Sequence, residues 1–226
     1  MGNVLYVGNR NYSSWSLRPW LCLKWAGIAF EERLVRLDQP GYGDHAVAEI
    51  AAASPNGRVP CLHADGLVIW DSLAIAEWAA EEAPSAGLWP IDRQVRATAR
   101  AVTSEIHGGF WEVREHLPMN IRRRAGPQAW GRRTAAEIAR IDEMWSGLRA
   151  DYGGGGRWLF GARTIADAFY TPVAARMRTY GVALSPTAQS YCDAVLSDTE
   201  FLAWEADCLP DSWDRHGYSV IDGLYR

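Results

Sequence analysis

Three serines stand close together at the start of a predicted helix. Ser13, Ser14 and Ser16 follow a short strand-like segment, NVLYVG, and lead into the apolar run LRPWLCLKWAG. The N-terminus of a helix favours negative charge, and a hydroxyl donates hydrogen bonds to anions. Both effects lower the pKa of a bound thiol from its free value of about 8.5. We therefore expect Ser13 or Ser14 to donate to the sulfur of a thiol substrate; simple capping of the helix is the alternative interpretation.

The same serines are poor candidates for a nucleophile. The chain has no GxSxG motif, and no His–Asp pair lies near these serines in the sequence to activate one of them. A hydrolase is therefore disfavoured.

A second candidate site is the pair Asp71-Ser72, which begins the helix-like segment DSLAIAEWAAEEA. Either residue could cap that helix, and this is the plain structural interpretation. The free N–H groups of the helix could instead hold a carboxylate, with Ser72 donating its hydroxyl and Asp71 receiving an ammonium. A ligand with an α-amino acid end would satisfy both residues.

A third candidate is Val59-Pro60 in the segment NGRVPCL, where a loop becomes a strand. Proline cannot donate to a sheet, so it belongs at the first residue or the edge of a strand. If the peptide bond is cis, the backbone of Val59 is free to pair with an extended ligand. An ordinary trans turn is the alternative.

These candidates lie in a first half that alternates between strand and helix patterns. The Asp65-Gly66 dipeptide separates two apolar runs and predicts a hairpin. The order βαβαββα predicts a small mixed sheet with helices packed against it. The expected strands cover 3–8, 29–37, 59–64 and 67–70, and the expected helices 16–27, 45–53 and 71–83.

The second half is predicted to be helical. Apolar residues three and four apart indicate one long helix from Val95 to Val113 and another from Ile138 to Tyr152. Further helices are expected over 164–181, 187–197 and 199–207, the first with a structural capping box in TIAD. The expected organisation is an α/β domain over 1–82, a linker over 83–92 and an all-helical domain over 93–226.

Composition excludes several classes of protein. The chain has 226 residues, 48% of them hydrophobic, and a net charge of −4, which argues against general nucleic-acid binding. Its four scattered cysteines form no metal-ligand pattern and suit free thiols in a reducing compartment. We see no pattern of a signal peptide at the start of the sequence. No apolar run approaches the roughly 20 residues that a helix needs to span a bilayer. We expect a cytoplasmic protein without a metal.

Together these segments resemble the cytosolic glutathione transferases over nearly the whole chain. The markers are SSWSLR after the first strand, GRVPCL, the acidic-Ser pair at 71–72, and TIAD in the helical half. The resemblance implies a thioredoxin-like first domain, an all-helical second domain and, usually, a homodimer. SSWSLR looks closest to the zeta class, which includes maleylacetoacetate isomerases, although that class usually has Cys where this chain has Trp15.

The resemblance also implies roles for individual residues. Ser13 matches the serine that activates glutathione in the serine-type classes, with Ser14 its nearest competitor. Val59 would pair its backbone with the cysteinyl part of glutathione, Pro60 would be cis, and Asp71 and Ser72 would hold the γ-glutamyl end. The remaining implied glutathione contacts are Trp15, Gln39, which would reach the glycyl carboxylate, and Arg58.

The segment IHGGFWEVR is expected to line the pocket for the second substrate. The resemblance assigns it His107, Phe110, Trp111 and Arg114; packing between helices or subunits is the alternative. Three functions follow from these expectations. The first is conjugation of the glutathione thiolate to a small hydrophobic electrophile, the second is glutathione-dependent cis–trans isomerisation, and the third is binding without catalysis.

Overall fold

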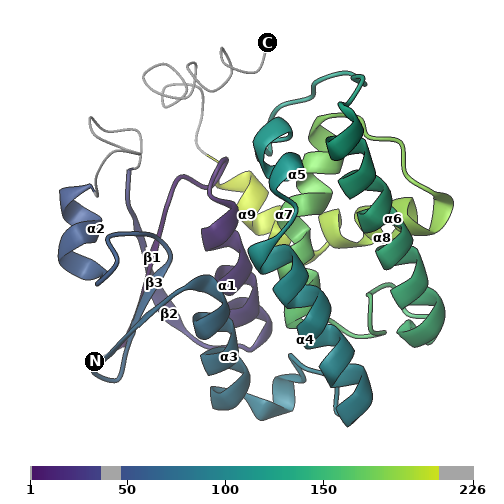
Figure 1. Cartoon of the computed structure of the whole chain (residues 1–226). Coiled ribbons are helices and arrows are strands. Elements are labelled where there is room, and N and C mark those ends of the chain that lie inside the picture. Colours follow the sequence, from purple (N-terminus) through teal and green to yellow (C-terminus); the bar gives the residue numbers. More distant parts are fainter. Residues whose placement is uncertain (1, 37–46, 209–226) are drawn as a thin grey trace.

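The computed structural model describes residues 2–36 and 47–208 of the chain (Figure 1). Its sheet has the strand order β2-β1-β3-β4, with β1 parallel to β2 and antiparallel to β3, and β3 antiparallel to β4. The hairpin predicted at Asp65-Gly66 joins β3 to β4 and is confirmed. The strands are β1 (Asn3–Val7), β2 (Phe30–Leu34), β3 (Cys61–Ala64) and β4 (Leu67–Trp70).

Helices cover both faces of this sheet. The helices α1 (Ser14–Trp25) and α3 (Ser72–Glu82) pack on the face that holds Leu5 and Val7, and α2 (Ala48–Ala53) lies on the other (Figure 1). Alternation along β1 explains this division, because Tyr6 points away from its neighbours and packs with Ile50 of α2. The thioredoxin-like fold expected for the first half is confirmed.

One detail of α1 differs from the prediction. The helix begins at Ser14, two residues before the predicted start at residue 16, and Pro19 lies inside it. Ser13 is therefore the N-cap residue, and Ser14 and Ser16 belong to the first turn.

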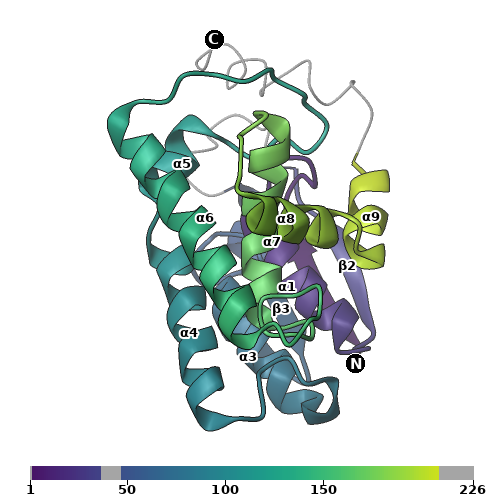
Figure 2. The ribbon, with the colours of Figure 1, turned by 90° about the vertical axis from the view of Figure 1, so that its right-hand side faces the viewer.

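The second half is helical, as predicted. Its central helix, α7 (Ile165–Thr179), is buried along almost its whole length and packs against α1, α4 and α8 (Figure 2). Because α7 is buried on nearly all sides and contacts α1 as well as α4 and α8, it joins the two halves of the molecule. The other elements are η1 (Pro84–Ala86), α4 (Arg93–Gly108), α5 (Trp111–His116), α6 (Arg132–Tyr152), α8 (Pro186–Leu196) and α9 (Thr199–Ala206).

The long helix expected from Val95 to Val113 was a wrong prediction, because the chain breaks between α4 and α5. A Cβ at Gly109 would lie 2.7 Å from the carbonyl oxygen of Glu105, and Phe110 takes a left-handed conformation at φ +56°. The Arg114 guanidinium turns back onto the freed carbonyls at the end of α4, donating to those of Ile106 and Gly109. This basic side chain suits the negative end of the helix dipole.

The capping box predicted in TIAD is present at the start of α7, between Thr164 and Asp167. The Asp167 carboxylate is fully buried and also accepts from the N–H of Leu159 and the hydroxyl of Tyr191, each at 3.1 Å. Burial raises the pKa of Asp167 to about 6, although these hydrogen bonds oppose the shift. Its role is structural, as expected.

Within 2–36 and 47–208, none of the helices is long and apolar enough to cross a bilayer. The four cysteines all lie in these ranges, and none of them forms a disulfide.

Candidate active site

Most of the predicted site residues come from two helix N-termini and from the helices that pack across them. The start of α1 supplies the serines, and the start of α3 supplies Asp71 and Ser72. The end of α4 places His107 against both, and α7 faces them from the second half of the chain.

Ser13 caps α1 and is almost completely buried. Its Oγ accepts from the N–H of Ser16 at 3.4 Å and donates to Ser16 Oγ at 2.8 Å. Ser16 Oγ in turn accepts from the N–H of Gly8 at 3.0 Å. The capping interpretation is therefore confirmed for Ser13, and it leaves a role toward a bound sulfur open, because a hydroxyl proton rotates to suit its acceptor.

Ser14 meets a cation from the second half. Arg176 Nη2 of α7 donates to Ser14 Oγ at 3.3 Å, so the serine oxygen accepts and its proton can be donated to a ligand. Burial, and then the charge of Arg114, lower the pKa of Arg176 to about 9, which still leaves the guanidinium protonated at neutral pH.

Asp71 is the N-cap of α3 and has an unusual backbone conformation, at φ +69° and ψ +148°. One carboxylate oxygen accepts from the N–H of Leu73 at 2.7 Å, and the other lies 3.4 Å from Nε2 of His107. Burial alone would raise the pKa of Asp71, but the hydrogen bonds from His107 and Leu73 and the charge of Arg18 lower it overall.

Ser72 follows as the first residue of α3. Its hydroxyl is buried and has no hydrogen-bond partner among the described residues. A buried polar atom without a partner costs free energy, so an atom of a ligand is well suited to this position. Asp71 and Ser72 both lie at the start of α3, and binding of an α-amino acid end by this pair stays a prediction.

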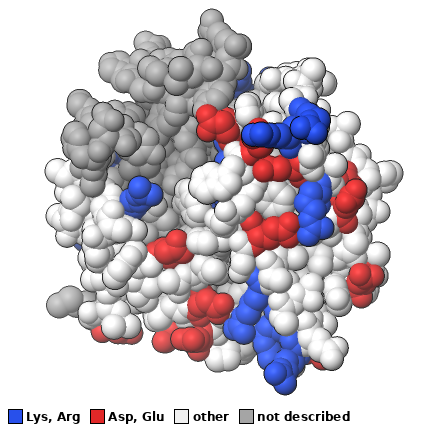
Figure 3. Space-filling model, viewed as in Figure 1, with Lys and Arg blue, Asp and Glu red and all other residues white. Residues whose placement is uncertain are grey.

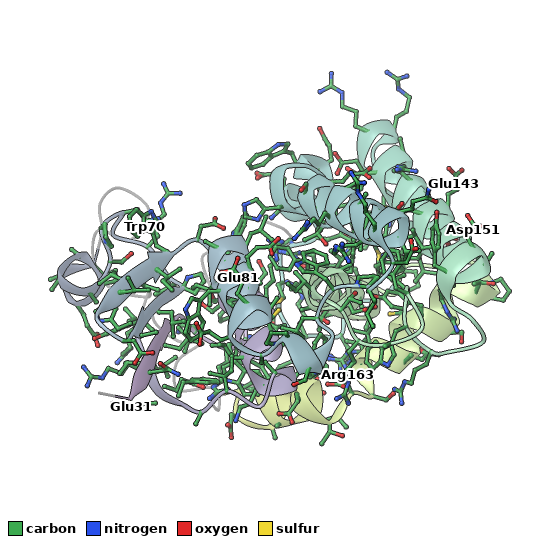
Figure 4. All side chains as sticks on the ribbon, turned by 90° about the horizontal axis from the view of Figure 1, so that it is seen from below. Glu31, Trp70, Glu81, Glu143, Asp151 and Arg163 are labelled. Carbon is green, nitrogen blue, oxygen red and sulfur yellow. The ribbon has the colours of Figure 1, made fainter. Side chains whose placement is uncertain are left out.

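The peptide bond between Val59 and Pro60 is cis, as the resemblance implies. Pro60 is buried directly before β3, Val59 is half-buried and Arg58 is exposed. Gln39 lies outside the described residues. In Figure 4, Trp70 marks the end of β4 next to Asp71; its side chain is 44% exposed.

Trp15 joins the glutathione side of the predicted site to the acceptor side. Its ring lies 4.3 Å from the guanidinium carbon of Arg18 and 5.0 Å from that of Arg114, and it meets the ring of His107 edge-on at 5.3 Å. His107 and Arg114 are thus brought to the site. Phe110 is buried in the hydrophobic core, and Trp111 is 69% exposed.

Arg114, which was predicted for the acceptor pocket, forms a cluster with two arginines that were not predicted as site residues, Arg18 and Arg176. Arg18 is fully buried, and none of its guanidinium nitrogens has a hydrogen-bond partner in the described part of the chain. Burial, then the charges of Arg114 and Arg176, lower the pKa of Arg18, and Asp71 opposes the shift. The only available signal was an arginine inside each of the apolar runs LRPWLCL and PVAARM.

Charges elsewhere are mixed. On the face shown in Figure 3, basic and acidic side chains lie interspersed over the helical half. Within the described ranges, no three His, Cys, Asp or Glu side chains are grouped so that they could hold a metal ion.

Comparison with known proteins agrees with this geometry. Residues 12–82 match the family model "Glutathione S-transferase, N-terminal domain". A maleylpyruvate isomerase from Ralstonia sp. is 30% identical over 199 residues, which cover 80% of this chain and 85% of that protein. Rat maleylacetoacetate isomerase is 37% identical over 107 residues, so the chain spans about half the length of the first curated relatives that it matches.

A solved structure of a related enzyme has a similar fold. Maleylacetoacetate isomerase from Anaeromyxobacter dehalogenans, with glutathione bound in its active site, is 29% identical and has a TM-score of 0.65. The similarity covers 93% of this chain and 98% of that one. The chain belongs to the glutathione S-transferase family.

Proposed function

We propose that this protein is an enzyme, a glutathione-dependent cis–trans isomerase whose substrate is a small unsaturated acid with more than one carboxylate. The arginine cluster beside the predicted sulfur position carries this proposal. It favours isomerisation of an anionic substrate over conjugation to a hydrophobic electrophile, which was the first of the three expected functions.

The cluster holds more positive charge than its surroundings neutralise. The negative charge of Asp71 stabilises the charged form of Arg18, and that of Glu137 stabilises the charged form of Arg114. The charges of the three arginines oppose one another. Buried charges without partners are costly, and an anionic ligand removes that cost. A neutral aromatic electrophile would leave it in place.

Within the cluster the three arginines have different tasks. Arg176 reaches the hydroxyl of Ser14, so we assign it to a carboxylate of the substrate. Arg114 is held by the carbonyls at the end of α4 and contributes positive charge. Arg18, whose guanidinium lies against the ring of Trp15, also contributes positive charge.

We propose that glutathione occupies the first half of the site. Asp71 and Ser72 hold its α-amino acid end, Val59 pairs with its backbone, and its sulfur lies at the start of α1 beside Ser13. Hydrogen bonds and the helix dipole there favour the thiolate, and each unit of pKa lowering corresponds to about 1.4 kcal/mol.

The reaction then needs no further reagent. The thiolate adds to one carbon of the cis double bond, and the π electrons move onto the conjugated carbonyl as an enolate. The former double bond rotates, the C–S bond breaks, and the enolate electrons form the trans double bond again. Glutathione leaves unchanged, and the arginines stabilise the enolate charge at each step.

The relatives support this choice of substrate. The names maleylpyruvate isomerase and maleylacetoacetate isomerase both describe isomerisation of a maleyl group, which is a cis-unsaturated acyl group with a carboxylate. We further propose a homodimer, as the resemblance implies, and a cytoplasmic location, which suits four unpaired cysteines.

A substrate panel tests the proposal. Isomerisation of a cis-enedioate such as maleylpyruvate is compared with that of its neutral diester and with conjugation of chlorodinitrobenzene. We expect turnover of the diacid to exceed that of both neutral compounds.

We also expect Arg176→Met to raise KM for the diacid about tenfold or more, and Arg176→Lys to have a KM between those of the wild type and Arg176→Met. Faster turnover of the neutral electrophile would support conjugation, and no turnover of any compound would support a binding protein.

A further inference from the structure

The loop between β1 and α1, which carries Ser13, is held in place by the second half of the chain. Trp204 of α9 donates from its indole N–H to the carbonyl of Arg10 at 2.9 Å. One residue further on, the carbonyl of Asn11 accepts from the N–H of Ile121 at 3.2 Å. Two successive peptide groups just before Ser13 are thus fixed by elements far away in the sequence.

The side chain of Asn11 adds a more specific contact. It is 6% exposed, its Oδ1 accepts from the N–H of Arg122 at 3.0 Å, and its Nδ2 donates to Oδ1 of Asn120 at 2.8 Å. Asn120 is 8% exposed, and its Oδ1 also accepts from the N–H of Arg123 at 3.2 Å. The two amides therefore form a buried pair between the two halves.

The segment that carries Asn120 is itself attached to α7. The Thr179 hydroxyl donates to the carbonyl of Asn120 at 2.8 Å, and the N–H of Ala125 donates to the carbonyl of Thr179 at 2.7 Å. The same helix supplies Arg176 to the hydroxyl of Ser14. α7 is thus connected to the start of α1 in two ways, through Asn120 to the loop before Ser13 and through Arg176 to the hydroxyl of Ser14.

We propose that Asn11 and Asn120 are positioning residues that set where the hydroxyl of Ser13 lies relative to the sulfur of glutathione. The inference rests on the proposed function, because it needs a thiolate at this loop. A hydroxyl stabilises a thiolate only at hydrogen-bond distance, and a displacement of about 1 Å can cost roughly a hundredfold in rate. Loosening the loop two residues before Ser13 therefore weakens activation of the thiol and leaves the distant γ-glutamyl contacts intact.

The hydrogen-bonding roles of the two amides allow a test with a series of Asn120 variants. Asn120 Oδ1 accepts from two N–H donors, so an aspartate at this position can replace it and an alanine cannot. We expect Asn120→Ala to lower kcat about tenfold or more, with KM for glutathione changed less than about threefold. We expect the thiol pKa of bound glutathione, followed by thiolate absorbance near 240 nm, to rise toward its free value of about 8.5. Asn120→Asp should stay close to the wild type.

Trp25→Phe provides the matched control. It removes another hydrogen bond between the halves, 3.1 Å from Trp25 Nε1 to Asp198 Oδ1, at the opposite end of α1. We expect this variant to lower the unfolding midpoint and to leave the thiol pKa unchanged. If Asn120→Ala does not fold, Asn120→Gln replaces it, since this variant moves the amide by one methylene. We expect Asn120→Gln likewise to lower kcat and to raise the thiol pKa.

The outcomes separate the two proposals. A wild-type protein that does not lower the thiol pKa contradicts the proposed function. A wild type that lowers it, with Asn120→Ala or Asn120→Gln doing so equally well, contradicts the positioning role alone. The positioning role is supported if the thiol pKa is raised in Asn120→Ala and Asn120→Gln but stays at the wild-type value in Asn120→Asp and in Trp25→Phe.

Discussion

At the scale of single residues, the start of α1 holds two hydroxyls with different surroundings. Ser13 caps the helix and shares its hydroxyl with Ser16, whereas Ser14 accepts from Arg176. The sequence placed Ser13, Ser14, Asp71 and Ser72 correctly at helix starts, because each stands just before an apolar helical run.

The two serines can be distinguished by truncating each one. We expect Ser13→Ala to lower turnover about a hundredfold, the usual cost of losing one donor to a developing anion, while the protein is still retained on glutathione resin. Ser14→Ala should cost less, because Arg176 remains to bind the substrate. Turnover by both variants is measured at saturating glutathione. A larger loss in Ser14→Ala would assign the sulfur contact to that residue.

Other site residues could not be predicted from the sequence. A helical pattern shows that Arg18 and Arg176 lie among buried positions, but it does not show which arginines meet. Their proximity depends on the packing of α1 against α7, between residues more than 150 positions apart. The same holds for the contact between Asn11 and Asn120.

At the scale of elements, the strands and most helices followed from apolar spacing, turn residues and caps. The single long helix predicted across the end of α4 was wrong for a local reason. The apolar spacing continues across Gly109, whereas the helical backbone is interrupted there. Arg114 satisfies the carbonyls at this break, so its presence in the site is tied to the kink.

The capping box of α7 predicts a pH dependence of stability. The folded-state pKa of Asp167 is raised to about 6 from an unfolded value near 3.8, so the folded protein binds the proton more tightly. The stability from this group is fully present below about pH 4 and is lost as pH rises through 6. Relative to Asp167→Asn, the wild type should lose up to about 3 kcal/mol of unfolding free energy between pH 4 and pH 7. Urea denaturation at several pH values measures this, and a constant difference between the two proteins would refute it.

At the scale of the whole molecule, β4 ends the sheet with an exposed apolar edge. Leu67 is 56% exposed, Val68 40% and Trp70 44%. An edge strand of this kind pairs readily with other chains unless a partner covers it, which supports the proposed homodimer. Sequence patterns indicated neither this edge nor the way in which the halves meet, because both depend on contacts between distant segments.

A charge on this edge tests the dimer. We expect the wild type to have twice the mass of one chain in light scattering, and Leu67→Lys to have the mass of one chain. Leu202→Lys, at a 47% exposed leucine on α9, is the matched control and should remain dimeric. A wild type that is monomeric at micromolar concentration would contradict the expectation.

Glutathione-dependent isomerisation is tested most directly by a product analysis by NMR. The protein is mixed with glutathione and an excess of a cis-enedioate such as maleylpyruvate, and both compounds are followed over time. We expect the trans isomer to accumulate over many turnovers while the glutathione signals stay undiminished. Consumption of one glutathione for each substrate molecule, or a cis-enedioate that persists unchanged, would contradict it.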